Sequence, residues 1–229
     1  MAHPAVPFSP AELAAQARAA ADAGAGAFHV HPRDGSGAET LAAEHVLAAV
    51  AAVRGATGLP VGVTTGIWAV EGDVQRRLAL VQRWTGPDRP DYASINMNEP
   101  GIEELADLLT RLGIRIEAGV WTAADARVLG ASGFGHRLLR VLLEPEELTQ
   151  AEAVTTAAEA AAELARLGIT ARQVRHGYDL ATWGVLRAAI ADGQDIRIGL
   201  EDTTVLPDGS PASGNADLVA AAARLVPES

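Results

Sequence analysis

The 229-residue chain contains no cysteine, and this absence excludes several kinds of chemistry. Without cysteine the chain has no thiol nucleophile, no disulfide framework, no cysteine-ligated zinc and no iron–sulfur cluster. Lysine is absent too, because all 18 basic residues are arginine. The chain therefore cannot form a lysine Schiff base, which excludes pyridoxal-phosphate enzymes and lysine-dependent aldolases, and it lacks the lysine of a P-loop.

Aromatic residues and positive charge are also scarce. Aromatic residues make up 4% of the chain, and the formal net charge is −11. This acidity disfavours nucleic acid or an anionic membrane as a partner, although a local group of arginines stays compatible with a phosphorylated ligand. No run approaches the length of a transmembrane helix, and residues 1–10 lack the layout of a signal peptide. We therefore expect a soluble, cytoplasmic protein.

Short apolar runs alternate with Ala- and Leu-rich helical stretches along the chain. The expected strands lie at about residues 27–31, 61–66, 92–96, 115–121, 137–143, 173–178 and 196–201. The expected helices lie at about residues 10–23, 38–55, 70–84, 102–112, 123–131, 149–167, 181–191 and 215–225. This alternation, with no internal linker, predicts one domain over residues 1–229 with a parallel sheet.

The number of strands bears on the type of sheet. Seven strands are clear, whereas a closed (β/α)8 barrel needs eight. We predict an α/β fold of the TIM-barrel type whose first strand is missing or reduced to residues 2–6. A doubly wound open sheet is the alternative, disfavoured because no G-x-G-x-x-G turn follows a strand. A gap left by the first strand would expose two unpaired strand edges, so we expect residues 2–6 or oligomerisation, by default a symmetric dimer, to cover it.

Two histidines, His29 and His31, are separated by one residue in the apolar run that forms the first clear strand. Side chains alternate between the faces of a strand, so both imidazoles are expected on the same face, one pleat apart. Pro32 and the turn-forming residues 34–37 end the run, which places the pair at the C-terminal end of the strand, where α/β proteins bind their ligands. This spacing suits two imidazole ligands of one metal ion.

Polar residues also end most of the other strands. They are Thr64, Thr65, Ser94, Asn96, Glu117, Glu144, His176, Arg197, Glu201 and Asp202. In a barrel the C-terminal strand ends converge on one pocket. Two histidines and one glutamate form a known catalytic zinc set that leaves one coordination position open, so Glu201 is the expected third ligand of a zinc ion.

Three of these acids and one histidine have alternative interpretations. Glu201 and Asp202 could instead form an acidic cap for the Arg197 guanidinium. Glu144 is followed by Pro and two more acids, a pattern typical of an exposed helix start, so we do not assign it to the site. His176 is either a pocket residue or a partly buried strand histidine.

Several motifs, in this order, resemble those of the β-keto acid cleavage enzymes, the family of 3-keto-5-aminohexanoate cleavage enzyme. They are HVHPRD at residues 29–34, TTG at 64–66 and RIGLED at 197–202. PFSPAE at 7–12 and NADLV at 215–219 resemble the segments at the family's first and closing helices. The resemblance spans nearly the whole chain and implies a TIM barrel.

The resemblance also implies a reaction and a site. The family joins a β-keto acid with acetyl-CoA by a retro-Claisen route, which gives acetoacetate and a new acyl-CoA. Zinc would be held by His29, His31 and Glu201. The residues expected in the pocket are the catalytic Arg197, Asp202 and Glu117 and the substrate-binding Thr64, Thr65, Ser94 and Asn96. Glu117 could instead pair with Arg115 at the sheet surface.

The chain departs from the family pattern in three places. The family's first strand, with its Asn-Gly-type turn, has no counterpart, and residues 97–100 and 176–179 differ from the usual stretches. These departures alter the substrate pocket more than the metal site. Two other hypotheses therefore stand beside the first: a zinc-dependent hydrolase or lyase on the same barrel that does not use CoA, and a catalytically silent metal-binding paralogue.

Overall fold

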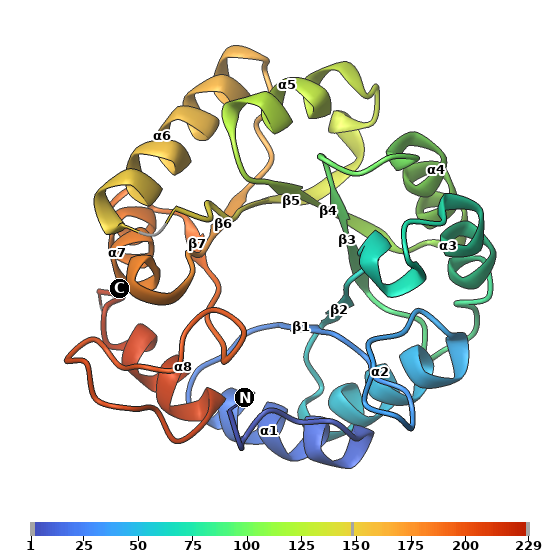
Figure 1. Ribbon diagram of the computed structural model, residues 1–229, viewed down its shortest axis with the longest axis horizontal. Coiled ribbons are helices and arrows are strands. Elements are labelled where there is room, and N and C mark those ends of the chain that lie inside the picture. Colours follow the sequence, from blue (N-terminus) through green and yellow to red (C-terminus); the bar gives the residue numbers. More distant parts are fainter. Residues whose placement is uncertain (1–2, 148, 228–229) are drawn as a thin grey trace.

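The computed structural model describes residues 3–147 and 149–227. Its strands form one parallel seven-stranded sheet in chain order from β1 to β7. The strands are β1 (Phe28–Val30), β2 (Val61–Val63), β3 (Tyr92–Asn96), β4 (Arg115–Val120), β5 (Leu138–Leu143), β6 (Gln173–Arg175) and β7 (Asp195–Ile196). The sheet curls around a central space with the helices outside it (Figure 1). The seven strands and the TIM-barrel type are confirmed.

The helices alternate with the strands, as the sequence predicts. They are α1 (Pro10–Asp22), α2 (Ala43–Thr57), α3 (Val74–Val81), α4 (Ile102–Leu112), α5 (Ala123–Ala131), α6 (Gln150–Arg166), α7 (Thr182–Ala191) and α8 (Asn215–Ala223). Short 3-10 helices lie at η1 (Ile67–Val70), η2 (Gly135–Arg137) and η3 (Asp179–Ala181). No helix in the described part of the chain is both long and apolar enough to cross a lipid bilayer.

Local sequence signals set several of these boundaries. Ser9 and Glu12 form a capping box at the start of α1, and Thr122 and Asp125 form another at the start of α5. Each box satisfies backbone N–H groups that have no partner within the helix. The strands are rich in Val, Ile, Leu and Ala and are largely buried, as expected when helices cover one face of a parallel sheet and side chains fill its interior.

The sheet does not close between its first and last strands. β1 pairs with β2 and β7 pairs with β6, and no pairing joins β1 to β7 within residues 3–147 and 149–227. Helices α1 and α8 contact each other outside this opening, which lies between the labels β1 and β7 in Figure 1. A cavity of about 1530 Å³ lies along the opening and extends to the C-terminal strand ends.

Residues 3–6 do not supply the missing strand. His3–Val6 form a turn closed by the Val6 N–H bond to the His3 carbonyl, so the prediction of a short first strand there is wrong, and residue 2 lies outside the described residues. His3 and Val6 do line the cavity, and the His3 ring is hydrogen-bonded to the Ala212 carbonyl. The segment therefore borders the opening without pairing with either strand edge.

The last strand is much shorter than predicted. β7 ends at Ile196, whereas the sequence pattern predicts a strand to residue 201. The Gly199 carbonyl accepts hydrogen bonds from the N–H groups of Asp202 and Thr203, which bends the chain into a turn. Asn215 on α8 accepts the Leu200 N–H and holds this turn in place. Glu201 and Asp202 therefore come from a turn after the strand and not from the strand itself.

Candidate active site

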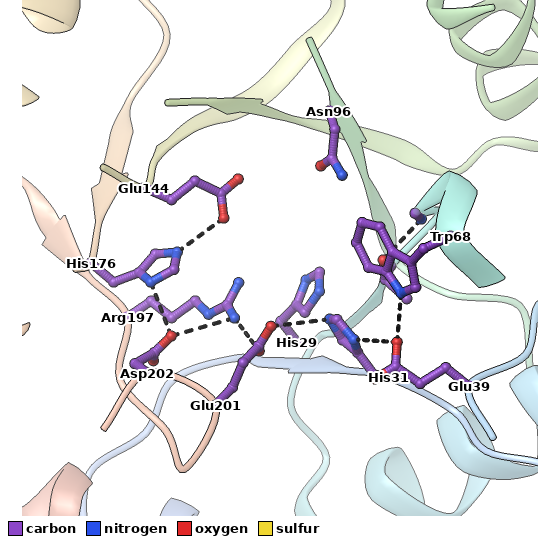
Figure 2. Close-up of polar contacts among 12 residues, drawn as sticks. His29, His31, Glu39, Trp68, Asn96, Glu144, His176, Arg197, Glu201 and Asp202 are labelled. Carbon is purple, nitrogen blue, oxygen red and sulfur yellow. Dashed lines mark hydrogen bonds and ion pairs between the residues drawn. The ribbon is translucent and has the colours of Figure 1, made fainter. Parts of the chain in front are cut away.

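The two histidines lie at the C-terminal end of β1 and line the same cavity. His29 is in the strand and His31 follows it directly. Their ring centroids are 5.3 Å apart at an interplanar angle of 61°. Val30, between them, is buried in the hydrophobic core. The alternation of side chains along the strand therefore brings both imidazoles to one wall, next to each other (Figure 2).

His31 lies between two carboxylates. Its Nδ1 is 3.0 Å from Oε2 of Glu39, and its Nε2 is 3.5 Å from Oε1 of Glu201. Glu39 also accepts hydrogen bonds from Trp68 Nε1 and from Arg33. Burial lowers the pKa of His31, but Glu39 and Glu201 outweigh it and the net pKa is raised. The hydrogen bond from His31 brings the pKa of Glu39 down to about 2, so this carboxylate is ionised at neutral pH.

Sequence reasoning did not find Glu39. The residue lies in the loop after β1, where an isolated bridge pairs it with Arg33. The signal that could have found it is the turn at residues 34–37, because a tight turn there returns the chain toward the strand end that carries His31.

His29 faces a carboxylate of its own. Its Nδ1 is 3.4 Å from Oε2 of Glu117, which is 1% exposed, and Arg140 Nε donates to Oε1 of Glu117 at 2.5 Å. Burial lowers the pKa of His29, which favours the neutral imidazole that can bind a metal. Burial alone would raise the pKa of Glu117, but His29 and Arg140 outweigh it and bring the pKa to about 2. The alternative pairing with Arg115 is wrong, because Arg115 is exposed and Arg140 is the partner of Glu117.

Arg197 binds both acids of the turn that follows β7. Its guanidinium donates to Glu201 and lies 3.6 Å from Oδ1 of Asp202. The Glu201 side chain is 45% exposed and reaches toward His31, whereas Asp202 is buried. Burial raises the pKa of Glu201, but Arg197 and His31 outweigh it, so the net pKa is lowered. Both interpretations therefore involve the Glu201 carboxylate: it caps the Arg197 guanidinium, and it lies close enough to His31 to join it as a metal ligand.

A buried histidine lies on the other side of Asp202. His176 Nδ1 is 3.0 Å from Asp202 Oδ1, and its Nε2 is 3.3 Å from Oε2 of Glu144. Tyr178 donates a hydrogen bond to the same oxygen of Glu144. Glu144 is 5% exposed, so its interpretation as part of an exposed helix start is wrong. The reason is that its N–H continues the β4–β5 ladder by donating to the Val120 carbonyl, which carries the side chain inward.

The protonation of His176 has a measurable consequence for stability. Burial and Arg197 lower its pKa, but Asp202 and Glu144 outweigh them and raise it from 6.5 to about 9. The folded state therefore holds a proton that the unfolded state releases, and this stabilisation is complete below pH 6.5 and lost as the pH rises to about 9. The shift corresponds to about 3 kcal/mol. Urea unfolding of the wild type and of His176→Gln at pH 6 and pH 9.5 should show the wild type's advantage shrinking by that order. An advantage that is the same at both pH values would contradict the assignment.

The four predicted substrate-binding residues are buried, and the side chains of Thr64, Thr65 and Asn96 make hydrogen bonds. Thr65 Oγ1 donates to the Ser94 carbonyl, and Thr64 Oγ1 accepts the Gly66 N–H. Asn96 Nδ2 donates to Glu99. Thr65 is thereby held by the backbone of β3 and Thr64 by the backbone of its own loop, while Glu99 fixes the orientation of the Asn96 amide through its nitrogen. None of the four is among the residues that line the cavity along the sheet opening.

The donor set fits a zinc ion, although it is not a ready-made site. Within the described residues, no group of three or more His, Cys, Asp or Glu side chains is close enough together to hold a metal ion. His31 Nε2 and Glu201 Oε1 are 3.5 Å apart, close to the about 3.4 Å between two ligands that lie about 2.1 Å from a tetrahedral ion. The Nδ1 atoms of His29 and His31 both face carboxylates, the usual arrangement of metal-binding histidines, and in that arrangement Nε2 is the atom that would bind the ion. Completing the set requires Glu201 to share its carboxylate between Arg197 and the ion.

A curled parallel α/β sheet with polar side chains gathered at its C-terminal strand ends is the architecture of barrel enzymes. A sequence model of the β-keto acid cleavage enzymes matches residues 1–131 and 176–229. The chain therefore belongs to the β-keto acid cleavage enzyme family. Among curated proteins, no sequence matches.

Solved structures give the same fold. ObcA in a binary complex with oxaloacetate matches with a TM-score of 0.72 at 18% identity, over 95% of this chain and 62% of ObcA. ObcA in a ternary complex with a C4-CoA adduct and oxalate matches with a TM-score of 0.75 at 18% identity, with the same coverage. The 3-dehydroquinate dehydratase of Aquifex aeolicus VF5 has a TM-score of 0.60 at 13% identity, over 93% of this chain and 92% of that one. The chain thus spans about three-fifths of the length of ObcA.

Proposed function

We propose that the protein is a zinc-dependent β-keto acid cleavage enzyme that converts a β-keto acid and acetyl-CoA into acetoacetate and a new acyl-CoA. The observation that carries this proposal is the position of Arg197 and Asp202 beside His31 and Glu201 on the wall of one cavity. Zinc donors, a cation and a buried carboxylate are the groups that this reaction needs. Membership of the family supports the same reaction.

Each side chain has a role that follows from its position. His29, His31 and Glu201 would hold the zinc ion, which as a Lewis acid would polarise a bound keto oxygen. Arg197, fixed by its acidic neighbours, presents a guanidinium that can bind the substrate carboxylate. Asp202 is buried and is the carboxylate placed to act as general base.

The proposed reaction balances without any further reactant. Asp202 takes a proton from the carbon between the keto and carboxylate groups, and this carbon attacks the acetyl carbonyl and displaces the CoA thiolate. The thiolate then attacks the keto carbon of the original substrate, and the bond from that carbon to the former nucleophilic carbon breaks. Acetoacetate leaves as an enolate and recovers the proton from Asp202. Neither lysine nor cysteine is required, in agreement with their absence.

The solved ObcA complexes support the proposed substrate classes. One holds oxaloacetate, which is itself a β-keto acid, and another holds a C4-CoA adduct. We extend these two ligand classes, a keto acid and CoA, to this chain as a proposal. The cytoplasmic location and the oligomer expected from the open sheet stay predictions.

A coupled assay tests the proposal. Protein purified without chelators is incubated with acetyl-CoA and a panel of β-keto acids, and mass spectrometry follows acetoacetate and acyl-CoA. We expect both products to appear in equal amounts with at least one acid, and to disappear after dialysis against a strong chelator. Consumption of the acid without acyl-CoA would favour the hydrolase or lyase hypothesis. No consumption of any acid, by protein that retains zinc, would favour the silent paralogue.

A further inference from the structure

Three side chains from neighbouring strands form a buried column next to His29. Tyr92 on β3 contacts Arg140 on β5, Arg140 contacts Glu117 on β4, and Glu117 contacts the His29 imidazole. Tyr92 and Glu117 are 2% and 1% exposed, and the Arg140 side chain is 20% exposed. Tyr92, Arg140 and His29 all line the same cavity. The roles proposed above use Glu117 and Arg140 in no step.

The base of this column is fixed to the strand that carries His29. The Tyr92 hydroxyl donates to the Phe28 carbonyl at 2.6 Å. Gly62 makes space for the ring, because a Cβ at this position would lie 2.0 Å from the ring carbon Cε2. A residue larger than glycine on β2 would therefore displace the tyrosine, and with it the support for the arginine.

Arg140 connects this base to the carboxylate. Its guanidinium carbon lies 4.6 Å from the centre of the Tyr92 ring, a cation–π contact, while Nε donates to Glu117 Oε1. The second oxygen of Glu117 is thereby left facing His29 Nδ1 at 3.4 Å. A planar guanidinium can stack on a ring and donate at its edge at the same time, which the ammonium of lysine cannot do.

We infer that Arg140 is a positioning residue for the metal ligand His29 and acts through Glu117. The inference rests on the zinc site of the proposed function. Partners behind a metal-binding histidine fix its tautomer and ring orientation. With Arg140 in place, Glu117 presents an oxygen to Nδ1 and Nε2 stays free to bind the ion. Without Arg140, Glu117 is a buried carboxylate that has lost its main cation, and its position relative to His29 is no longer fixed.

Two measurements on Arg140→Gln test this inference. In the metal-free protein, imidazole ¹⁵N NMR at one fixed pH reports the tautomer of His29, assigned with His29→Gln. Competition with a chromophoric chelator gives the dissociation constant for zinc. Arg137→Gln is the matched control, because Arg137 lies directly before β5, pairs with the exposed Asp107 and does not line the cavity. Arg140→Lys keeps the positive charge, and it takes the place of the glutamine variant if that variant does not fold.

We expect Arg140→Gln to weaken zinc binding about 10- to 100-fold, the usual range for such partners, and to shift His29 away from the Nδ1–H tautomer. Arg140→Lys should lie between this variant and the wild type, and Arg137→Gln should match the wild type. In a Glu117→Gln background, Arg140→Gln should add little, because the effect passes through Glu117. Wild-type zinc affinity together with an unchanged His29 tautomer in Arg140→Gln would overturn the inference. If Arg140→Gln does not fold, the same result in Arg140→Lys would overturn it. A wild-type protein that binds no zinc would overturn the metal assignment itself and with it this role.

Discussion

Replacing His31 with alanine is expected to reduce bound zinc from about one ion per chain to less than about a tenth of an ion. The imidazole would supply one of the three proposed protein ligands, and its Nε2 already lies 3.5 Å from Glu201. The substitution also leaves Glu39 without the histidine that it orients. Turnover should fall below detection, because the remaining His29 and Glu201 cannot retain the ion against buffer. Elemental analysis after purification without chelators measures the effect.

A matched control variant distinguishes the loss of the metal ion from a loss of folded structure. His45 lies on α2 and does not line the cavity, so His45→Ala should keep the wild-type zinc content. Far-UV circular dichroism should show the same secondary structure for both variants. A full complement of zinc in the His31→Ala protein would contradict the ligand assignment, as would a wild-type protein with less than about a tenth of a zinc per chain.

The parts of the site that the sequence could predict follow from strand periodicity. His29 and His31 are separated by one residue in a strand, so their common wall follows from backbone geometry alone. The parallel order of the strands then places Arg197, Glu201 and Asp202 at the same, C-terminal end of the strands as the histidines. Both inferences need only local pattern and the rule that strand ends converge.

The supporting contacts could not be predicted in the same way, because they join residues that only the folded chain brings together. Arg140 follows Glu117 by 23 residues and meets it across the β4–β5 register, where a bulge between Ile116 and Glu117 shifts the pairing. Nothing in either strand's own pattern marks that shift. Glu144 shows the opposite error, since its acidic neighbours suggest exposure while the ladder carries its side chain inward.

The short β7 has a similar cause. Residues 196–201 have the composition of a strand, but a strand needs a partner on at least one side to satisfy its backbone groups. The pairing of β7 with β6 stops at Ile196, opposite Arg175, the last residue of β6, and within the described residues β7 has no pairing with β1 on its other side. The chain bends at Gly199 instead, and Asn215 satisfies the Leu200 N–H. The turn that presents Glu201 and Asp202 thus follows from the end of β6 on one side and the open sheet edge on the other.

Replacing Asp202 with asparagine is expected to leave zinc bound and to lower turnover at least ~10²-fold, the scale of lost general base catalysis. The carboxylate is buried between two cations, with Oδ1 3.6 Å from Arg197 and 3.0 Å from His176. Asparagine has the same shape but cannot accept a proton from the substrate carbon. Because Asp202 is not one of the three proposed ligands, zinc content should not change, which distinguishes this variant from His31→Ala.

The same substitution removes a charge that two cations share, so stability must be measured beside turnover. Urea unfolding at pH 7 shows whether the variant is folded under assay conditions, and the exposed Asp208 supplies the control Asp208→Asn, which should keep wild-type turnover. The KM for the β-keto acid should change less than kcat, because in the proposed site Arg197 and the zinc ion, rather than Asp202, would bind the substrate's oxygens. Full turnover in a folded, zinc-loaded Asp202→Asn protein would show that another group accepts the proton. Glu144, which contacts the other nitrogen of His176, would then be the next carboxylate to test.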